Sequence, residues 1–220
     1  MALTPPKQEK KSSRVPLKAS VYPATCIGIY GIGTHEETYQ GETKSRNKVI
    51  LNFEVKGQRR TITTDDGDKR VPYTITGWYT FSYYKKATLA EHLSNWRGTG
   101  MSKEEENDFD LFSMLGKNCL LTVTNKTDKK GNIVSDKIGN ISGLMDGMEP
   151  FESELTHSYF SFIDHGREIP DDVPPWIVKQ IQSSKEWGFM EDAGNRLASD
   201  EGPILEPEFM EQEMYDDIPY

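Results

Sequence analysis

Apolar and polar residues alternate along five stretches of this chain, and a period of two predicts β-strands. The stretches run over residues 15–32, 44–56, 73–85, 117–125 and 133–141. Between the third and the fourth, over residues 88–97 and 102–115, the apolar residues recur at helical spacing instead. The pattern therefore predicts three strands, a helical insert and two further strands.

The first stretch is interrupted by Gly28, Gly31 and Gly33. Glycine inside a strand often marks a bulge or a sharp bend of a barrel. The polar residues 33–43 that follow predict a loop, and residues 128–132 (DKKGN) predict a hairpin turn between the last two strands.

The second stretch has two distinct faces. Alternate positions from Val49 to Val55 are apolar and predict a face toward the core. The opposite face carries Lys44, Arg46, Lys48, Ile50, Asn52 and Glu54. This division predicts a half-buried strand with a basic outer face.

The third stretch is aromatic on both of its faces. One face is predicted to join the core, and it carries Tyr73, Ile75, Tyr79, Phe81 and Tyr83. The other face places Trp78 and Tyr84 among threonine and serine residues. A tryptophan in such polar surroundings is hard to explain as core.

Helix boundaries are marked by capping patterns. Thr88 with Glu91, and Ser102 with Glu105, have the spacing of a capping box, in which the two side chains satisfy free backbone N–H groups. A third helix is predicted over residues 175–187, since two prolines precede it and Gly188 follows it. Its apolar residues Trp176, Ile177 and Ile181 are expected to dock on the barrel formed by the strands.

This order of elements predicts a mainly β protein. Five strands with a helix between strands 3 and 4 are the layout of the OB-fold, a five-stranded Greek-key barrel. We expect three parts: a flexible basic arm over residues 1–14, the OB-fold domain over 15–188, and a disordered acidic tail over 189–220.

The charge of the chain is concentrated at its C-terminal end. Residues 191–220 contain ten carboxylates and one cation, an excess that equals the formal net charge of −9 for all 220 residues. Residues 1–190 are therefore neutral in sum, with the excess of cations in residues 1–86. A body polarised in this way favours a polyanionic partner for one face.

The sequence gives little evidence of a catalytic or metal site. The four histidines and two cysteines have no metal-ligand spacing, and the run DDGD at residues 65–68 lacks the remaining ligands of a calcium loop. Cys26 and Cys119 each lie in an apolar strand, which predicts buried free thiols. We expect no enzyme activity, no cofactor and no membrane span.

Single-stranded nucleic acid is bound by cations along its phosphates and by aromatic rings that stack on its bases. Both kinds of residue are present on the predicted outer faces and in the loop between strands 2 and 3. The predicted DNA-binding residues are Lys44, Arg46, Lys48, Arg59, Arg60, Trp78 and Tyr84. The alternative is a solvated strand face with one half-covered tryptophan, because outer strand faces often carry lysine.

The last five residues predict a second interaction. They are Asp216, Asp217, Ile218, Pro219 and Tyr220. An acidic segment that ends in Ile-Pro-aromatic offers an apolar plug and a carboxylate to a basic pocket of a partner protein. The same acid could occupy the protein's own cationic groove, or it could be a solubilising tail.

This terminus resembles the DDDIPF ending of bacterial single-stranded DNA-binding proteins, with Tyr220 in place of phenylalanine. Four segments of the body are similar to bacteriophage OB-fold single-stranded DNA-binding proteins. They are YPATCIGIYGIGTHEETYQGE, NWRG, FDLFSMLGK and PPWIVKQIQSSKEW, within residues 20–187. The resemblance implies sequence-independent binding of single-stranded DNA, and recruitment of replication or recombination proteins by the tail, in the cytoplasm of an infected bacterium.

Two other functions fit the same residues. A single-strand annealing or recombination mediator would also bind single strands but would pair complementary ones. A protein-interaction module on an OB scaffold would not bind nucleic acid. The expected partners are single-stranded DNA and replication or recombination proteins, and a homo-oligomer is possible; the pattern predicts neither the oligomeric state nor the partner of the tail.

Overall fold

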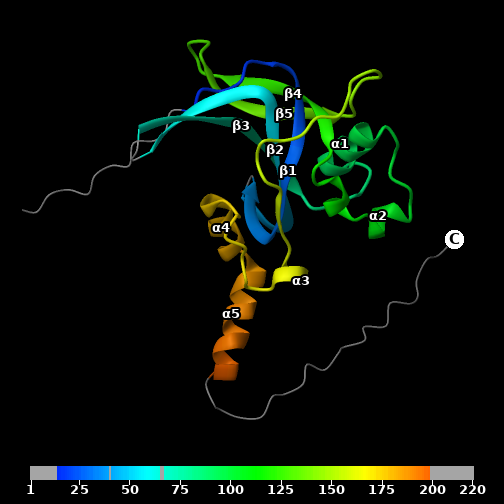
Figure 1. The fold of residues 1–220 in the computed structure, drawn as a ribbon. Helices are drawn as coiled ribbons and strands as arrows, with labels where there is room; N and C mark the ends of the chain where they lie inside the picture. Colours follow the sequence, from blue (N-terminus) through cyan, green and yellow to red (C-terminus); the bar gives the residue numbers. More distant parts are fainter. Residues whose placement is uncertain (1–13, 40, 65–66, 199–220) are drawn as a thin grey trace, which may run out of the picture.

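The fold is that of a computed structural model, which describes residues 14–39, 41–64 and 67–198. It is mainly β, as predicted: five antiparallel strands form one strongly curled sheet, a half-barrel consistent with an OB-like fold (Figure 1). Their bounds are β1 Ser20–Tyr39, β2 Glu42–Thr64, β3 Gly67–Thr80, β4 Asn118–Thr127 and β5 Ile133–Ser142. A short sixth strand, β6 Ser158–Phe160, pairs parallel to β1.

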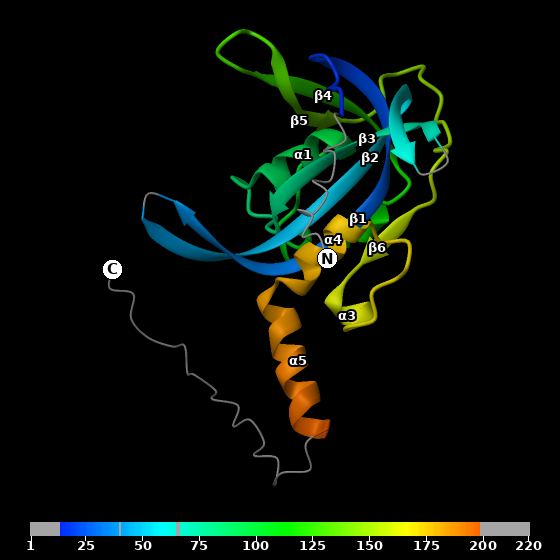
Figure 2. The same cartoon turned by 90° about the vertical axis from the view of Figure 1, so that its left-hand side faces the viewer.

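The strands are hydrogen-bonded in the order β3-β2-β1-β4-β5. β1 belongs to three ladders: its first residues pair with β4, residues 24–39 pair with β2, and Gly28–Tyr30 pair with β6. The β1–β2 and β2–β3 hairpins project on opposite sides of the body (Figure 2). A loop was predicted over residues 33–43, but residues 33–39 and 42–43 continue the paired strands of the β1–β2 hairpin.

The glycine-rich segment of β1 contains the irregularities that its sequence predicts. Register shifts lie between Cys26 and Gly28 and between Gly31 and Gly33. Gly33 has a φ of 79°, in the left-handed region that favours glycine. The first shift changes which positions of β1 face the concave core: Ala24 and Cys26 face it before the shift, and Ile29 faces it afterwards.

The concave side of the sheet encloses the larger hydrophobic core. Alternate residues of β2 and β3, including Phe53, Ile75 and Tyr79, contribute to it together with α1 (Thr88–Arg97). Trp96 of α1 packs on Phe53 with ring centroids 5.7 Å apart, and its indole N–H donates to the Asn118 carbonyl at 2.8 Å. The core roles predicted for Tyr79, Tyr83 and Trp96 are confirmed.

A second apolar layer covers the convex side, where the sequence predicted an open basic face. Ile50 lies on the predicted polar face of β2, yet it is fully buried between the sheet and α4 (Pro175–Gln182). Ile177 and Ile181 of α4 are also fully buried, which confirms their predicted docking. The basic face is therefore open only toward the start of β2.

Polar residues of β2 are buried on the same side. Glu54 is 6% exposed, and its carboxylate accepts hydrogen bonds from the backbone N–H groups of Glu154 at 2.9 Å and Leu155 at 2.8 Å. These bonds replace the water that the charge loses on burial. The segment between β5 and β6 is thereby held across β2.

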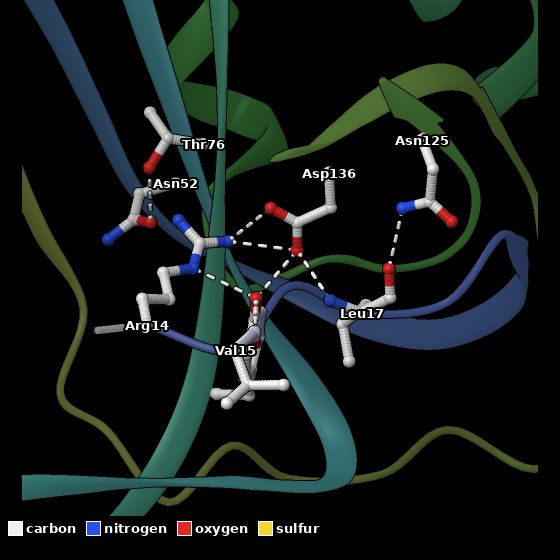
Figure 3. Close-up of polar contacts among 8 residues, drawn as sticks. Arg14, Val15, Leu17, Asn52, Thr76, Asn125 and Asp136 are labelled. Atoms are coloured by element: carbon white, nitrogen blue, oxygen red, sulfur yellow. Dashed lines mark hydrogen bonds and ion pairs between the residues drawn. The ribbon is translucent and has the colours of Figure 1, made fainter. Parts of the chain in front are cut away.

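Side chains, rather than a backbone ladder, connect β3 with β5 across the opening of the half-barrel. Asp136 of β5 accepts hydrogen bonds from Arg14 at 2.9 and 3.1 Å, from the Leu17 backbone at 3.0 Å and from the Tyr73 hydroxyl at 2.6 Å (Figure 3). Arg14 is the last residue of the predicted flexible arm, yet its side chain is held by Asp136. His92 of α1 is a second link between β3 and β5. Its Nδ1 lies 3.0 Å from the Tyr79 hydroxyl of β3, and its ring forms a hydrogen bond with the Gly139 backbone of β5.

The helical segments follow the capping patterns in part. Ser102 and Glu105 form the predicted capping box at α2 (Glu105–Asp108), with bonds of 2.9 and 3.2 Å between side chains and backbone. Thr88 does not cap α1, because Ala87 occupies the capping position and no side chain caps the helix there. A 3₁₀ turn, η1 (Leu111–Met114), follows α2 and leads into β4.

The C-terminal helix is two helices rather than one. After the short α3 (Phe162–His165), α4 ends at Gln182 and α5 spans Lys185–Ala198, extending away from the sheet in both views (Figures 1 and 2). Gly188, the predicted stop, lies inside α5, so residues 189–198 are helical although the sequence analysis assigned them to the tail. The residues Asp216–Tyr220 and residues 1–13 lie outside the described residues.

Candidate nucleic-acid interface

Four of the predicted DNA-binding residues line one groove. Arg46 and Lys48 come from β2, Trp78 from β3, and Tyr84 from the segment between β3 and α1. The groove has a volume of about 440 Å³, within the range of small-molecule sites, and Lys86 also lines it. We call it the cationic groove.

The start of α1 forms one end of the cationic groove. Ala87, Thr88 and Leu89 line it, and they are the capping residue and first two residues of the helix. The first N–H groups of a helix have no partner within it and carry a partial positive charge. Because no side chain caps α1, these groups add to the attraction that the groove exerts on an anion.

Each of the three predicted cations in the β1–β2 hairpin, Lys44, Arg46 and Lys48, is paired with a carboxylate of the same hairpin. Glu37 of β1 contacts Lys48 at 2.7 Å and Arg46 at 3.6 Å, while Lys44 contacts Glu42 at 2.9 Å. The hydrogen bond from Lys48 holds the pKa of Glu37 below its ordinary value, helped by the charges of Lys48 and Arg46. An incoming phosphate must therefore compete with Glu37.

The exposed tryptophan of the groove does not stand alone. Trp78 is 52% exposed, and its ring centroid lies 5.8 Å from that of Trp176, which is 42% exposed and lies in the first turn of α4. The interplanar angle is 40°, so the rings form a bent platform at the junction of the sheet and α4. The sequence predicted that Trp176 docks on the barrel with Ile177, but Trp176 is exposed whereas Ile177 is fully buried.

The segment after β3 exposes two further rings. Tyr84 is 63% exposed, as its position on the polar face predicted. The core assignment of Phe81 is wrong, since its side chain is 42% exposed. β3 ends at Thr80 and the chain bends there, so the alternation of a strand no longer sets which way Phe81 points.

Arg59 and Arg60 lie far from the cationic groove. They are residues of the β2–β3 hairpin rather than of a loop, and Arg59 pairs with Pro72 across the ladder. Arg46 is 13 residues earlier on the same strand, or roughly 40 Å of strand at about 3.3 Å per residue. Arg59 is also engaged by Glu154, whose carboxylate oxygens lie 2.6 and 2.7 Å from the guanidinium.

The described cysteines and histidines form no recognisable nucleophile or metal site. Both thiols are free and buried, and burial raises the pKa of Cys26 to about 12, so it is a poor nucleophile. Within residues 14–39, 41–64 and 67–198, no cluster of three or more His, Cys, Asp or Glu side chains could hold a metal ion. No helix of this part is long and apolar enough to cross a membrane.

Three residues of the interface escaped sequence reasoning, each for a different reason. Trp176 was grouped with its buried neighbours, although it is the second residue of α4 and directly precedes the buried Ile177. Lys86 follows the strand, where alternation ends. Phe81 was assigned by alternation, although β3 ends at Thr80 and the pattern no longer applies beyond it.

The chain was also compared with known proteins. Neither a scan against protein-family models nor a search of curated proteins gave a match.

Proposed function

We propose that this protein binds single-stranded DNA along the cationic groove, without catalysis and largely without regard to sequence. The observation that carries the proposal is the groove itself, in which cations, an uncapped helix start and exposed aromatic rings lie side by side. Phosphates are attracted by the first two, and bases stack on the third. A finer assignment of the curled sheet as an OB-fold barrel agrees with this use.

The two chemical parts of the groove are arranged along β2 and β3. Lys48 pairs with Thr80 across the ladder, and Ile50 pairs with Trp78. The cations therefore lie along the β1–β2 hairpin, and the Trp78–Trp176 platform lies next to them toward α4. A strand that follows the hairpin with its backbone reaches the platform with its bases.

Titration with oligo-dT at several salt concentrations tests this mechanism. If Lys44, Arg46, Lys48 and Lys86 all contact phosphates, the logarithm of affinity should fall with the logarithm of salt concentration, with a slope of about −3. A slope near zero would exclude phosphate contacts as the source of affinity. Fluorescence gives the second readout, because stacking should quench Trp78 and Trp176.

Variants at the platform identify the stacking residues. Trp78→Ala and Trp176→Ala should each weaken oligo-dT binding about tenfold, since a stacked base contributes ~1–3 kcal/mol. Trp187→Phe is the matched control, because Trp187 packs on Arg167 away from the groove. Equal affinity of all three variants would place the DNA elsewhere.

The proposal extends to biological role through the resemblance of the sequence. The protein would coat single-stranded DNA in phage replication or recombination, and Asp216–Tyr220 would recruit partner proteins. Deletion of residues 210–220 should leave oligo-dT affinity equal or higher, because it removes acid that competes with DNA. Loss of DNA binding on this deletion would contradict the separation of the two roles.

A further inference from the structure

A second hollow adjoins the cationic groove on the side of α2. It has a volume of about 420 Å³ and is lined by Phe81, Ser82, Tyr83, Tyr84 and Glu106. We call it the base pocket. Ser82 and Tyr84 line both hollows, so the Tyr84 ring stands between them.

The two hollows differ in charge. The cationic groove has Arg46, Lys48 and Lys86 in its lining, whereas Glu106 is the only charged residue that lines the base pocket among the residues that the structure describes. Among the described residues, no cation forms an ion pair with Glu106. A phosphate is therefore attracted to the groove and repelled from the pocket.

The base pocket is lined by one buried ring, Tyr83, and by two exposed rings, Phe81 and Tyr84. The buried Tyr83 ring meets Phe81 edge-on at 5.5 Å and Phe109 edge-on at 5.6 Å. Phe81 and Tyr84 are both exposed, and they present faces on which a planar base can stack. The Tyr83 hydroxyl is buried without a hydrogen-bond partner among the described residues.

Glu106 is held in place by its neighbour on α2. The Glu105 carboxylate accepts the Ser102 backbone N–H at 2.9 Å and also contacts the Arg97 guanidinium. The capping box and this ion pair fix the start of α2, and Glu106 is its second residue. A carboxylate presented by an anchored segment can discriminate between ligands.

We infer that the base pocket receives one base of a bound single strand and prefers guanine there, a preference superimposed on otherwise sequence-independent binding. An ionised carboxylate only accepts hydrogen bonds, and it can accept two in parallel. Guanine presents a ring N–H and an amino group side by side on its Watson–Crick edge. Adenine and cytosine present one amino group beside an acceptor, and thymine presents one ring N–H flanked by two carbonyl oxygens that Glu106 repels.

The inference rests on the proposed function, and the experiment separates the two. The probes are oligo-dT and the same oligonucleotide with one central guanine or one central hypoxanthine, which lacks the amino group of guanine. Full-length protein should bind the guanine oligonucleotide about tenfold more tightly than oligo-dT, as expected for one well-placed bidentate contact. The hypoxanthine oligonucleotide should show little of this gain.

Glu106→Gln should remove the preference for guanine, because an amide offers only one acceptor oxygen. Glu91→Gln is the matched control: it removes the same charge from an exposed glutamate that does not line the base pocket, and it should keep the preference. An equal gain in affinity for all oligonucleotides in Glu106→Gln would mean that Glu106 acts only through its charge, which overturns the inference.

The remaining outcomes are also decisive. Binding of oligo-dT with no gain for guanine in the unaltered protein overturns the base pocket and leaves the proposed function standing. Failure of all three oligonucleotides to bind overturns the proposed function itself. A preference for guanine that survives Glu106→Gln assigns base reading to other residues and also contradicts the inference.

Discussion

Glu37 sets how strongly the cationic groove attracts an anion, because its carboxylate lies against both Lys48 and Arg46. Replacing it with glutamine leaves these cations in place and removes their internal partner. We expect Glu37→Gln to raise oligo-dT affinity severalfold at fixed salt concentration, measured by fluorescence titration.

The matched control for this change is Glu149→Gln, which removes one negative charge from an exposed residue that does not line the groove. It should alter affinity only slightly, since exposed charges far apart are screened by salt. If both variants gained equally, net charge and not the contact with Arg46 and Lys48 would explain the effect.

His92 makes stability depend on pH. Burial lowers its pKa below the ordinary 6.5, against smaller opposing effects of a hydrogen bond with the Gly139 backbone and of the Glu91 charge. The unfolded chain therefore takes up a proton as pH falls below about 6.5, while the folded protein does so only at lower pH. Stability should fall across this window and be full above it.

The pH prediction is checked by urea unfolding on both sides of the ordinary histidine pKa. His92→Asn should be less stable than the unaltered protein at neutral pH, because it loses the contact with Tyr79. It should also lose less of its stability on acidification. An unchanged pH slope in the variant would assign the dependence to other groups.

Among the elements, the β1–β2 hairpin is the one that needs outside support. Two strands alone are only marginally stable in water. The first turn of α5 supplies the support: Glu186 accepts hydrogen bonds from the Thr34 N–H at 2.6 Å and hydroxyl at 2.7 Å, and Lys185 pairs with Glu36 at 2.9 Å. The hairpin carries Lys44 and Arg46, so α5 positions part of the groove.

We expect Glu186→Ala to speed backbone hydrogen exchange in residues 33–48 while leaving the core strands protected, measured by mass spectrometry. DNA affinity should fall with it, because the cations lose their fixed position. Glu191→Ala is the control from the same helix, since Glu191 pairs with Arg167, at 3.7 Å, and not with a residue of the hairpin among those that the structure describes. Equal exchange in both variants would contradict the role of α5.

The sequence predicted whether a segment is a strand or a helix better than it predicted where that element begins and ends. Period-two alternation located the five antiparallel strands but not β6, and in β2 the concave core takes the alternate residues Val49, Leu51, Phe53 and Val55. Alternation did not predict the long hairpins, because their residues are polar on both faces. The division into α4 and α5 falls at residues 183–184 and was not predicted; Gly188 lies inside α5, because one glycine weakens a helix without ending it.

At the scale of the whole molecule, the sequence predicted only those residues of the candidate site whose direction follows from the two faces of a strand. Arg46, Lys48 and Trp78 follow from the faces of β2 and β3. Trp176 joins them from about 100 residues later in the chain, an approach that depends on how α4 packs over Ile50. Alternation describes neighbours along a strand and contains no signal for such a contact.

The closure of the half-barrel is also a property of the whole molecule. Asp136 has a side chain only 4% exposed, and it joins the Arg14 segment, β3 and β5 through its two oxygens. Removing the acid from such a site leaves the Tyr73 hydroxyl and the Leu17 N–H without their acceptor. Asp136→Ala should therefore lower the free energy of unfolding by about 3 kcal/mol, as breaking a buried ion pair does.

Urea denaturation of Asp136→Ala, Arg14→Ala and the double variant measures this link. Arg14 is partly exposed, so its single replacement should cost less, and the double variant should cost less than the two single losses combined, because both residues belong to one network. Lys18→Ala, an exposed cation of the same segment, should be nearly neutral. Additive losses would mean that Arg14 and Asp136 stabilise the fold independently, and that β3 and β5 are joined by the core alone.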